Sequence, residues 1–156
     1  MQFVIVTGLS GSGKSLAVNA LEDIGFYCID NMPPQLISKF AEISTQSDVK
    51  IDRVAIVADI RGGELFLSLA DIIHELKEQG LDVKILFIDA ADEVITKRYK
   101  ETRRKHPLDE AAHGSIENAI ETERDILHSV RANADYYIDT SFLSTSQLKE
   151  QINVYN

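Results

Sequence analysis

A segment of eight residues near the N-terminus contains the residue types that bind phosphate. It reads Gly-Leu-Ser-Gly-Ser-Gly-Lys-Ser and matches the pattern G-x-x-x-x-G-K-[ST], directly after an apolar run and before a helical pattern. Glycines let successive backbone N–H groups turn toward phosphate oxygens, the lysine adds a positive charge, and the serine hydroxyl can ligate Mg²⁺. The pattern therefore predicts a phosphate-binding P-loop made of Gly8, Leu9, Ser10, Gly11, Ser12, Gly13, Lys14 and Ser15.

A metal-bound nucleotide also needs an acidic residue close to this loop. Two apolar runs end in an aspartate: 53–58 is followed by Asp59, and 83–88 is followed by Asp89. We favour Asp59 as the second metal ligand beside Ser15, because it precedes a flexible polar loop at the sheet edge where ligands bind in such folds. Asp89 is assigned to the turn that leads into the next helix.

A third acidic residue, Asp30, follows the apolar run 26–29 and is expected at the same edge as the P-loop. It is interpreted either as a group that positions water or an acceptor, or as part of a turn before Pro33 and Pro34. Both interpretations stay open. The catalytic candidates are therefore Lys14, Asp30 and Asp59.

A basic run at 97–105 stands out in a chain whose net charge is −9, because six of its nine residues are Lys or Arg. It has three interpretations: a lid that places Arg103 and Arg104 on nucleotide phosphates, a surface for RNA phosphates, or a solvated helix face. The acidic balance of the whole chain argues against a protein that coats nucleic acid over its entire surface. The acidic side chains further along are expected on a solvated helix face: Glu117, Glu121, Glu123 and Asp125.

Strands and helices that could position these residues alternate along the chain. Short apolar runs predict strands at 3–7, 26–29, 53–58, 83–88 and 136–138. Apolar residues at helical spacing predict helices that include 16–24, 65–76 and 116–130, and the first two are expected to end at Gly25 and Gly80. Further helices are expected to begin after Pro33, at Asp92, and at Ser144, which forms a capping box with Gln147. Continuous apolar strands are typical of a parallel sheet buried on both faces. The predicted fold is α/β, a three-layer, kinase-like P-loop NTPase sandwich with about five parallel strands.

The length of 156 residues fits a single domain spanning 1–156. The one cysteine, Cys28, cannot form an internal disulfide, and no apolar run approaches the roughly 20 residues of a membrane span. The N-terminal residues lack the basic start and the cleavage site of a signal peptide. We therefore expect a cytoplasmic protein with no membrane partner.

Several stretches resemble the RapZ/YvcJ family of bacterial nucleotide-binding proteins. They are the P-loop, the segment ALEDIGFYCIDN at 20–31, the segment at 59–61, residues within 99–108, and the late segment that ends at Ser141. The resemblance implies binding of ATP and GTP, with ATPase and GTPase activity. It assigns the P-loop to ATP and the next segment to GTP: Asp59, Ile60, Arg61 and Gly62.

The same resemblance implies partners. Some family members are adapters that bind small regulatory RNAs and direct a ribonuclease to them. Members are longer than this chain, which therefore resembles their N-terminal domain.

Three functions remain open at this stage. The first is a regulatory P-loop NTPase, with slow hydrolysis because no residue is identified that would orient water as in fast GTPases. The second is a small-molecule or nucleotide kinase whose acceptor would sit among Asp30, the segment after Pro34, and Arg61. The third is a nucleic-acid-binding module built on the basic run. The oligomeric state, including a homo-oligomer, is left open.

Overall fold

The computed structural model describes residues 2–9, 11–30, 36–37, 39–40, 42–43, 53–57, 69–102 and 116–154. Its strands are β1 (Gln2–Gly8), β2 (Tyr27–Ile29), β3 (Arg53–Val57), β4 (Asp82–Asp89) and β5 (Tyr136–Asp139). Its longer helices are α1 (Lys14–Asp23), α4 (Leu69–Glu78), α5 (Asp92–Thr102), α6 (Ile116–Ala132) and α7 (Thr145–Val154). The described parts of 36–43 are also helical.

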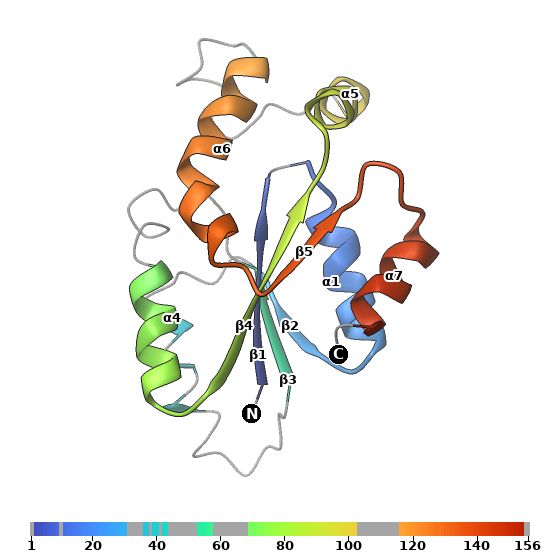
Figure 1. Cartoon of the computed structure of the whole chain (residues 1–156). Coiled ribbons are helices and arrows are strands. Elements are labelled where there is room, and N and C mark those ends of the chain that lie inside the picture. The colour runs from blue at the N-terminus through green and yellow to red at the C-terminus, as the bar shows by residue number, and fades with distance from the viewer. Residues whose placement is uncertain are drawn as a thin grey trace.

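The five strands form one parallel sheet in the order β2-β3-β1-β4-β5. Strand β1 lies at the centre and is almost continuously buried, from Phe3 to Leu9. All strands point the same way, so their carboxyl ends meet at one edge, at the top of Figure 1. The predicted fold class is confirmed: a parallel sheet between two layers of helices.

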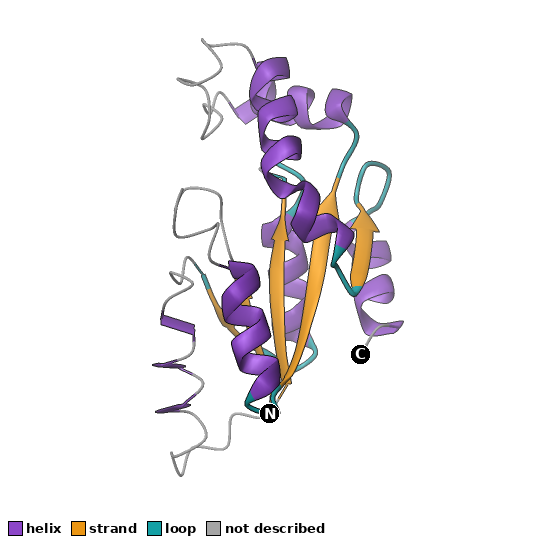
Figure 2. Cartoon of the chain, turned by 60° about the vertical axis from the view of Figure 1, so that its left-hand side comes forward, coloured by secondary structure: helices purple, strands orange, loops and turns teal. Residues whose placement is uncertain are grey.

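Each face of the sheet has its own apolar core. Helices α4 and α6 cover one face, where Phe3, Ile5 and Phe87 pack against Leu76 and Leu127. Helices α1 and α7 cover the other face (Figures 1 and 2). Residues that alternate along the strands belong to opposite cores because successive side chains of a strand point to opposite faces. The sheet is therefore buried on both sides, as continuous apolar strands require.

Most predicted element ends lie within one or two residues of those observed. Gly25 adopts a φ of +100° after α1 and its N–H donates to the Glu22 carbonyl, which confirms the predicted stop. At α7, the Ser144 N–H donates to Gln147 Oε1 at 2.9 Å and the Gln147 N–H to Ser144 Oγ at 3.2 Å, so the capping box is confirmed. The predicted strand residue at 58 and helix residues at 65–68 lie outside the described residues.

One sequence expectation is corrected on the helices. Glu123 was expected on the solvated face of α6, but it is fully buried, whereas Glu117, Glu121 and Asp125 are exposed. The spacing of the acidic residues along the sequence does not show that Glu123 is buried while the others are exposed. Helix α5 begins at Asp92 as expected, and the Asp92 carboxylate accepts hydrogen bonds from Arg124.

A membrane-spanning helix would need a longer apolar stretch than any helix in the described part of the chain provides.

Candidate nucleotide-binding site

The loop after β1 begins with a glycine that no other residue could replace without a clash. Gly8 has a φ of +143°, and a Cβ built on it would lie 2.0 Å from the Ile88 carbonyl oxygen. The next N–H, that of Leu9, donates to the same carbonyl at 3.3 Å. The Leu9 side chain is buried in the α4/α6 core. The start of the loop is thus held against the end of β4.

The remainder of the loop folds into a turn that starts α1. Both the N–H and the hydroxyl of Ser12 donate to the Leu9 carbonyl, at 3.1 Å and 2.5 Å. Gly11 and Gly13 take φ values of +80° and +102°, which favour glycine. The carbonyl of Gly13 accepts the first intrahelical bonds of α1. The loop therefore ends on the helix N-terminus, where backbone N–H groups and the helix dipole favour an anion.

A pocket of about 350 Å³ opens beside this turn. Lys14 contributes a positive charge to its wall, and the Lys14 Nζ donates to the Gly8 carbonyl at 3.2 Å. Ser15 and Leu16 come from the first turn of α1 and are exposed. The lining residues are Gly11, Gly13, Lys14, Ser15, Leu16, Arg98 and Tyr99. Glycine backbone, a cation and an apolar side chain on one wall suit a phosphate group attached to an organic body.

Helix α5 packs against the P-loop. The Arg98 Nη1 donates to the Gly11 carbonyl at 2.8 Å. The Tyr99 ring lies against Gly11 so closely that a Cβ there would come within 2.9 Å of Tyr99 Cε2. Both residues lie within the basic run, whose charge was visible in the sequence. Their individual contacts with the loop were missed, because helical spacing does not show which face of α5 meets the P-loop.

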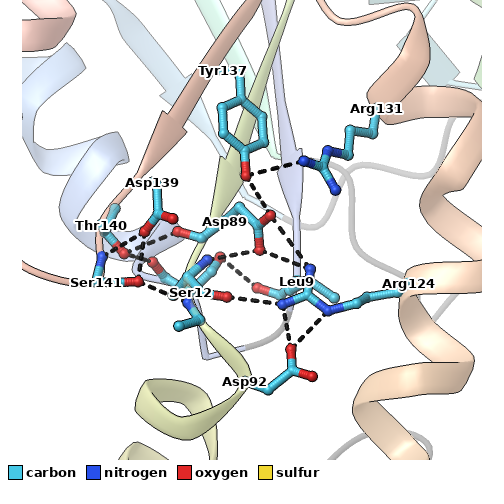
Figure 3. Close-up of polar contacts among 12 residues, drawn as sticks. Leu9, Ser12, Asp89, Asp92, Arg124, Arg131, Tyr137, Asp139, Thr140 and Ser141 are labelled. Carbon is cyan, nitrogen blue, oxygen red and sulfur yellow. Dashed lines mark hydrogen bonds and ion pairs between the residues drawn. The ribbon is translucent and has the colours of Figure 1, made fainter.

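The end of β5 is a further support that the sequence did not reveal. The Thr140 hydroxyl donates to the Ser12 carbonyl, and the Thr140 N–H donates to the Asp89 carbonyl at 2.9 Å. Next to it, Ser141 Oγ accepts a hydrogen bond from the Ala91 N–H at 2.7 Å. Figure 3 shows these contacts on the left of the cluster. They join the P-loop to the ends of β4 and β5.

In the middle of Figure 3, Asp89 is buried, with 4% of the residue exposed, and its carboxylate lies between three donors. It accepts hydrogen bonds from the Ala90 N–H at 2.7 Å, from Tyr137 OH at 2.6 Å and from Arg124 Nη1 at 3.1 Å. Arg124 Nη2 also donates to the Ala90 carbonyl at 2.9 Å. Burial, and then the hydrogen bond to Asp89, raises the pKa of Tyr137 to about 12. Asp89 is the last residue of β4, directly before the connection to α5, and its carboxylate also bonds to Arg124 of α6 and Tyr137 of β5.

The predicted site residues divide into three groups. The structure brings together the loop residues Gly8, Leu9, Gly11, Ser12, Gly13, Lys14 and Ser15. The exposed Asp30 follows β2, which is separated from β1 by β3. The remaining predicted residues lie outside the described residues: Ser10, Asp59, Ile60, Arg61, Gly62, Arg103 and Arg104. In the described ranges, no group of three or more His, Cys, Asp or Glu residues could hold a metal ion.

Solved structures of other proteins share the fold of this chain. Shikimate kinase from Acinetobacter baumannii, solved in complex with shikimate, is 16% identical with a TM-score of 0.62, over 99% of this chain and 92% of that one. The YorR protein from Bacillus subtilis, solved in complex with phosphorylated GDP, is 18% identical with a TM-score of 0.61, over 99% and 95%. At these identities the likeness concerns the fold alone.

Sequence comparison identifies the family. The model of the RapZ-like N-terminal domain matches residues 1–155, and the chain belongs to this family. A nucleotide-binding protein of Acetivibrio thermocellus is 57% identical over 152 residues, which are 97% of this chain and 52% of that protein. A nucleotide-binding protein of Caldicellulosiruptor bescii is 53% identical over the same shares. The chain thus spans about half the length of these relatives, and the expected resemblance to the family is confirmed.

Proposed function

We propose that this chain is a regulatory nucleotide-binding domain that binds ATP and GTP with Mg²⁺ and hydrolyses them slowly. The observation that supports this most is the formed P-loop. Its glycine backbone, the N-terminus of α1 and Lys14 border one pocket of about 350 Å³. The names of the relatives agree with a nucleotide as the ligand.

In this proposal the loop residues bind the phosphates and the metal. Lys14 moves from the Gly8 carbonyl to the β and γ phosphates, where its charge has an anionic partner. Ser15, exposed at the pocket, and Asp59 fit the oxygen ligands that Mg²⁺ prefers. Asp30 positions water, and the segment from Asp59 to Gly62 takes part in GTP binding.

The basic run is proposed to act as a lid, with Arg103 and Arg104 on the nucleotide phosphates. The first part of the run, which lies on α5, supports this, because Arg98 and Tyr99 already border the P-loop pocket. The regulatory role is proposed for the longer protein, in which the domain acts with a small regulatory RNA and a ribonuclease in the cytoplasm. A homo-oligomer is compatible with this role.

A second candidate is a small-molecule kinase that transfers the γ-phosphate to an acceptor. The fold shared with shikimate kinase and a gluconokinase favours it. The acceptor would then bind near Asp30 and Arg61.

The test follows γ-labelled ATP and GTP by thin-layer chromatography with Mg²⁺, with and without a panel of phosphate acceptors. We expect slow release of free phosphate that does not depend on the acceptor. Lys14→Ala should weaken nucleotide binding on the order of 100-fold, because the main cation at the phosphates is lost. Asp59→Asn should reduce the dependence on Mg²⁺.

The outcomes separate the candidates. Label that moves onto an acceptor replaces the NTPase proposal with the kinase. Unchanged nucleotide binding by Lys14→Ala, with unchanged circular dichroism, contradicts the assignment of the P-loop.

A further inference from the structure

Two consecutive carbonyl groups of the P-loop accept hydrogen bonds from side chains of other elements. The Gly11 carbonyl accepts from Arg98 Nη1 at 2.8 Å. The Ser12 carbonyl accepts from the Thr140 hydroxyl. These supports come from α5 and from the end of β5, far from the loop in sequence.

The direction of a carbonyl fixes the direction of the N–H in the same peptide. In a trans peptide the two groups point in opposite directions, and the described chain contains no cis peptide. Because the Ser12 carbonyl points at Thr140, the Gly13 N–H points away from Thr140. The Ser12 N–H likewise points away from Arg98, and it is bound to the Leu9 carbonyl. Gly13 itself lines the pocket.

Thr140 and Arg98 are also linked to each other. A hydroxyl has one proton to donate, and two carbonyl oxygens lie within reach of Thr140 Oγ1: that of Ser12, which is the nearer, and that of Asp89 at 3.2 Å. While the proton is donated to Ser12, the oxygen can only accept elsewhere. Arg98 Nη1 lies 3.4 Å from this oxygen and is a donor. The Thr140 backbone is fixed in turn, because its N–H donates to the Asp89 carbonyl. The hydroxyl is therefore held at both its donor and its acceptor side.

We propose that Thr140 and Arg98 are positioning residues of the P-loop, which turn its carbonyls outward so that the Gly13 N–H faces a phosphate oxygen of the nucleotide. This inference rests on the proposed function, since it takes the loop to bind a nucleotide. It assigns a role in binding to the end of the last strand.

The test compares variants that remove or keep the hydroxyl. Thr140→Val keeps the shape of the side chain and loses the hydrogen bond, and we expect binding of ADP and of inorganic tripolyphosphate to weaken about tenfold. Thr140→Ser keeps the hydroxyl and should restore most of this affinity. Thr122→Val is the matched control, because the Thr122 hydroxyl donates to the Asn118 carbonyl on the exposed face of α6. It should bind as the wild type does.

A second readout isolates the orientation of the peptide from general stability. The Gly13 amide resonance in ¹⁵N–¹H spectra should shift on addition of ADP in the wild type, and shift much less in Thr140→Val. Arg98→Lys should weaken binding too, and combining it with Thr140→Val should add little, because both act on neighbouring peptides of one loop. If Thr140→Val does not fold, Arg98→Lys and Thr140→Ser carry the test.

Three results would count against the inference. Wild-type affinity in Thr140→Val overturns it, and so does an equal loss in Thr140→Ser, since the hydroxyl would then not be the cause. A wild-type chain that binds neither ADP nor tripolyphosphate overturns the proposed function, and the inference falls with it.

Discussion

Two neighbouring strands of this sheet end in polar groups arranged in opposite ways. After β1, the P-loop turns its glycine backbone and Lys14 toward a pocket. After β4, the Asp89 carboxylate is buried and accepts hydrogen bonds from Ala90, Arg124 and Tyr137. The strands pair in register, with Gly8 beside Ile88, so the two arrangements touch.

The difference shows how a ligand site can be distinguished from a structural cluster at the same sheet edge. A carboxylate whose two oxygens both accept bonds from the protein contributes to the fold. In the P-loop, Thr140 holds the Ser12 carbonyl, so the Gly13 N–H of the same peptide points the opposite way. This comparison agrees with the preference for Asp59 over Asp89 as the proposed metal ligand.

The largest effect is expected where the two regions meet. Gly8→Ala places a Cβ about 2 Å from the Ile88 carbonyl oxygen, so the end of β1 must move away from β4. We expect a loss of at least about 4 kcal/mol in the free energy of unfolding, or no folded protein. Thermal and denaturant unfolding followed by circular dichroism measures it.

Gly80→Ala is the control for this substitution. Gly80 also has a positive φ, +83°, but a Cβ there meets no atom within 4 Å. Only the backbone strain of about 1 kcal/mol should remain. Equal losses for the two variants would show that strain, and not the contact between β1 and β4, decides the effect.

The second effect tests the cluster after β4. Arg124→Ala leaves the buried Asp89 charge without its cation, and we expect the free energy of unfolding to fall by about 3 kcal/mol. Asp89→Asn in the same background should recover part of this loss, because the uncompensated charge is removed. Denaturant unfolding at pH 7 is the measurement.

Lys149→Ala supplies the comparison for a surface pair. Lys149 and Asp23 are about half exposed, so their ion pair should contribute less than about 1 kcal/mol. A loss for Arg124→Ala that is no larger than this would contradict the structural role of the cluster.

The smallest effect concerns alkaline pH. The pKa of Tyr137 rises from its ordinary 10.0 to about 12 in the fold, so its neutral form is favoured in the native state. This contribution to stability is complete below pH 10 and is lost as the pH rises from 10 to 12. Denaturant unfolding across this range should show a smaller fall in stability for Tyr137→Phe than for the wild type. Parallel curves for the two proteins would contradict this.

Much of the fold follows from local patterns. The apolar runs and the glycines at 25 and 80 predicted the described strands and helix ends, because burial on both faces leaves a continuous apolar signal. The loop from Gly8 to Ser15 could also be predicted, because all the residues of its motif lie in one short segment.

The supports of the site could not be predicted in this way. Thr140 is one threonine among several, and its role depends on β5 ending beside Ser12. Glu123 is a charged residue of the kind expected on a solvated helix face, yet it is buried. Arg124 lies on α6, and its partner Asp89 is the last residue of β4. Contacts between segments distant in sequence leave no periodic signal within either segment.

The Thr140–Ser12 contact also constrains when the site can form. It joins residues 128 positions apart, so the loop lacks this support until the last strand has docked. Contacts of such long range form slowly, because a large loop of chain must close before they are gained. During synthesis, the P-loop leaves the ribosome early but is completed only after β5 has emerged. Full affinity of this domain for a nucleotide would therefore require that β5 has docked.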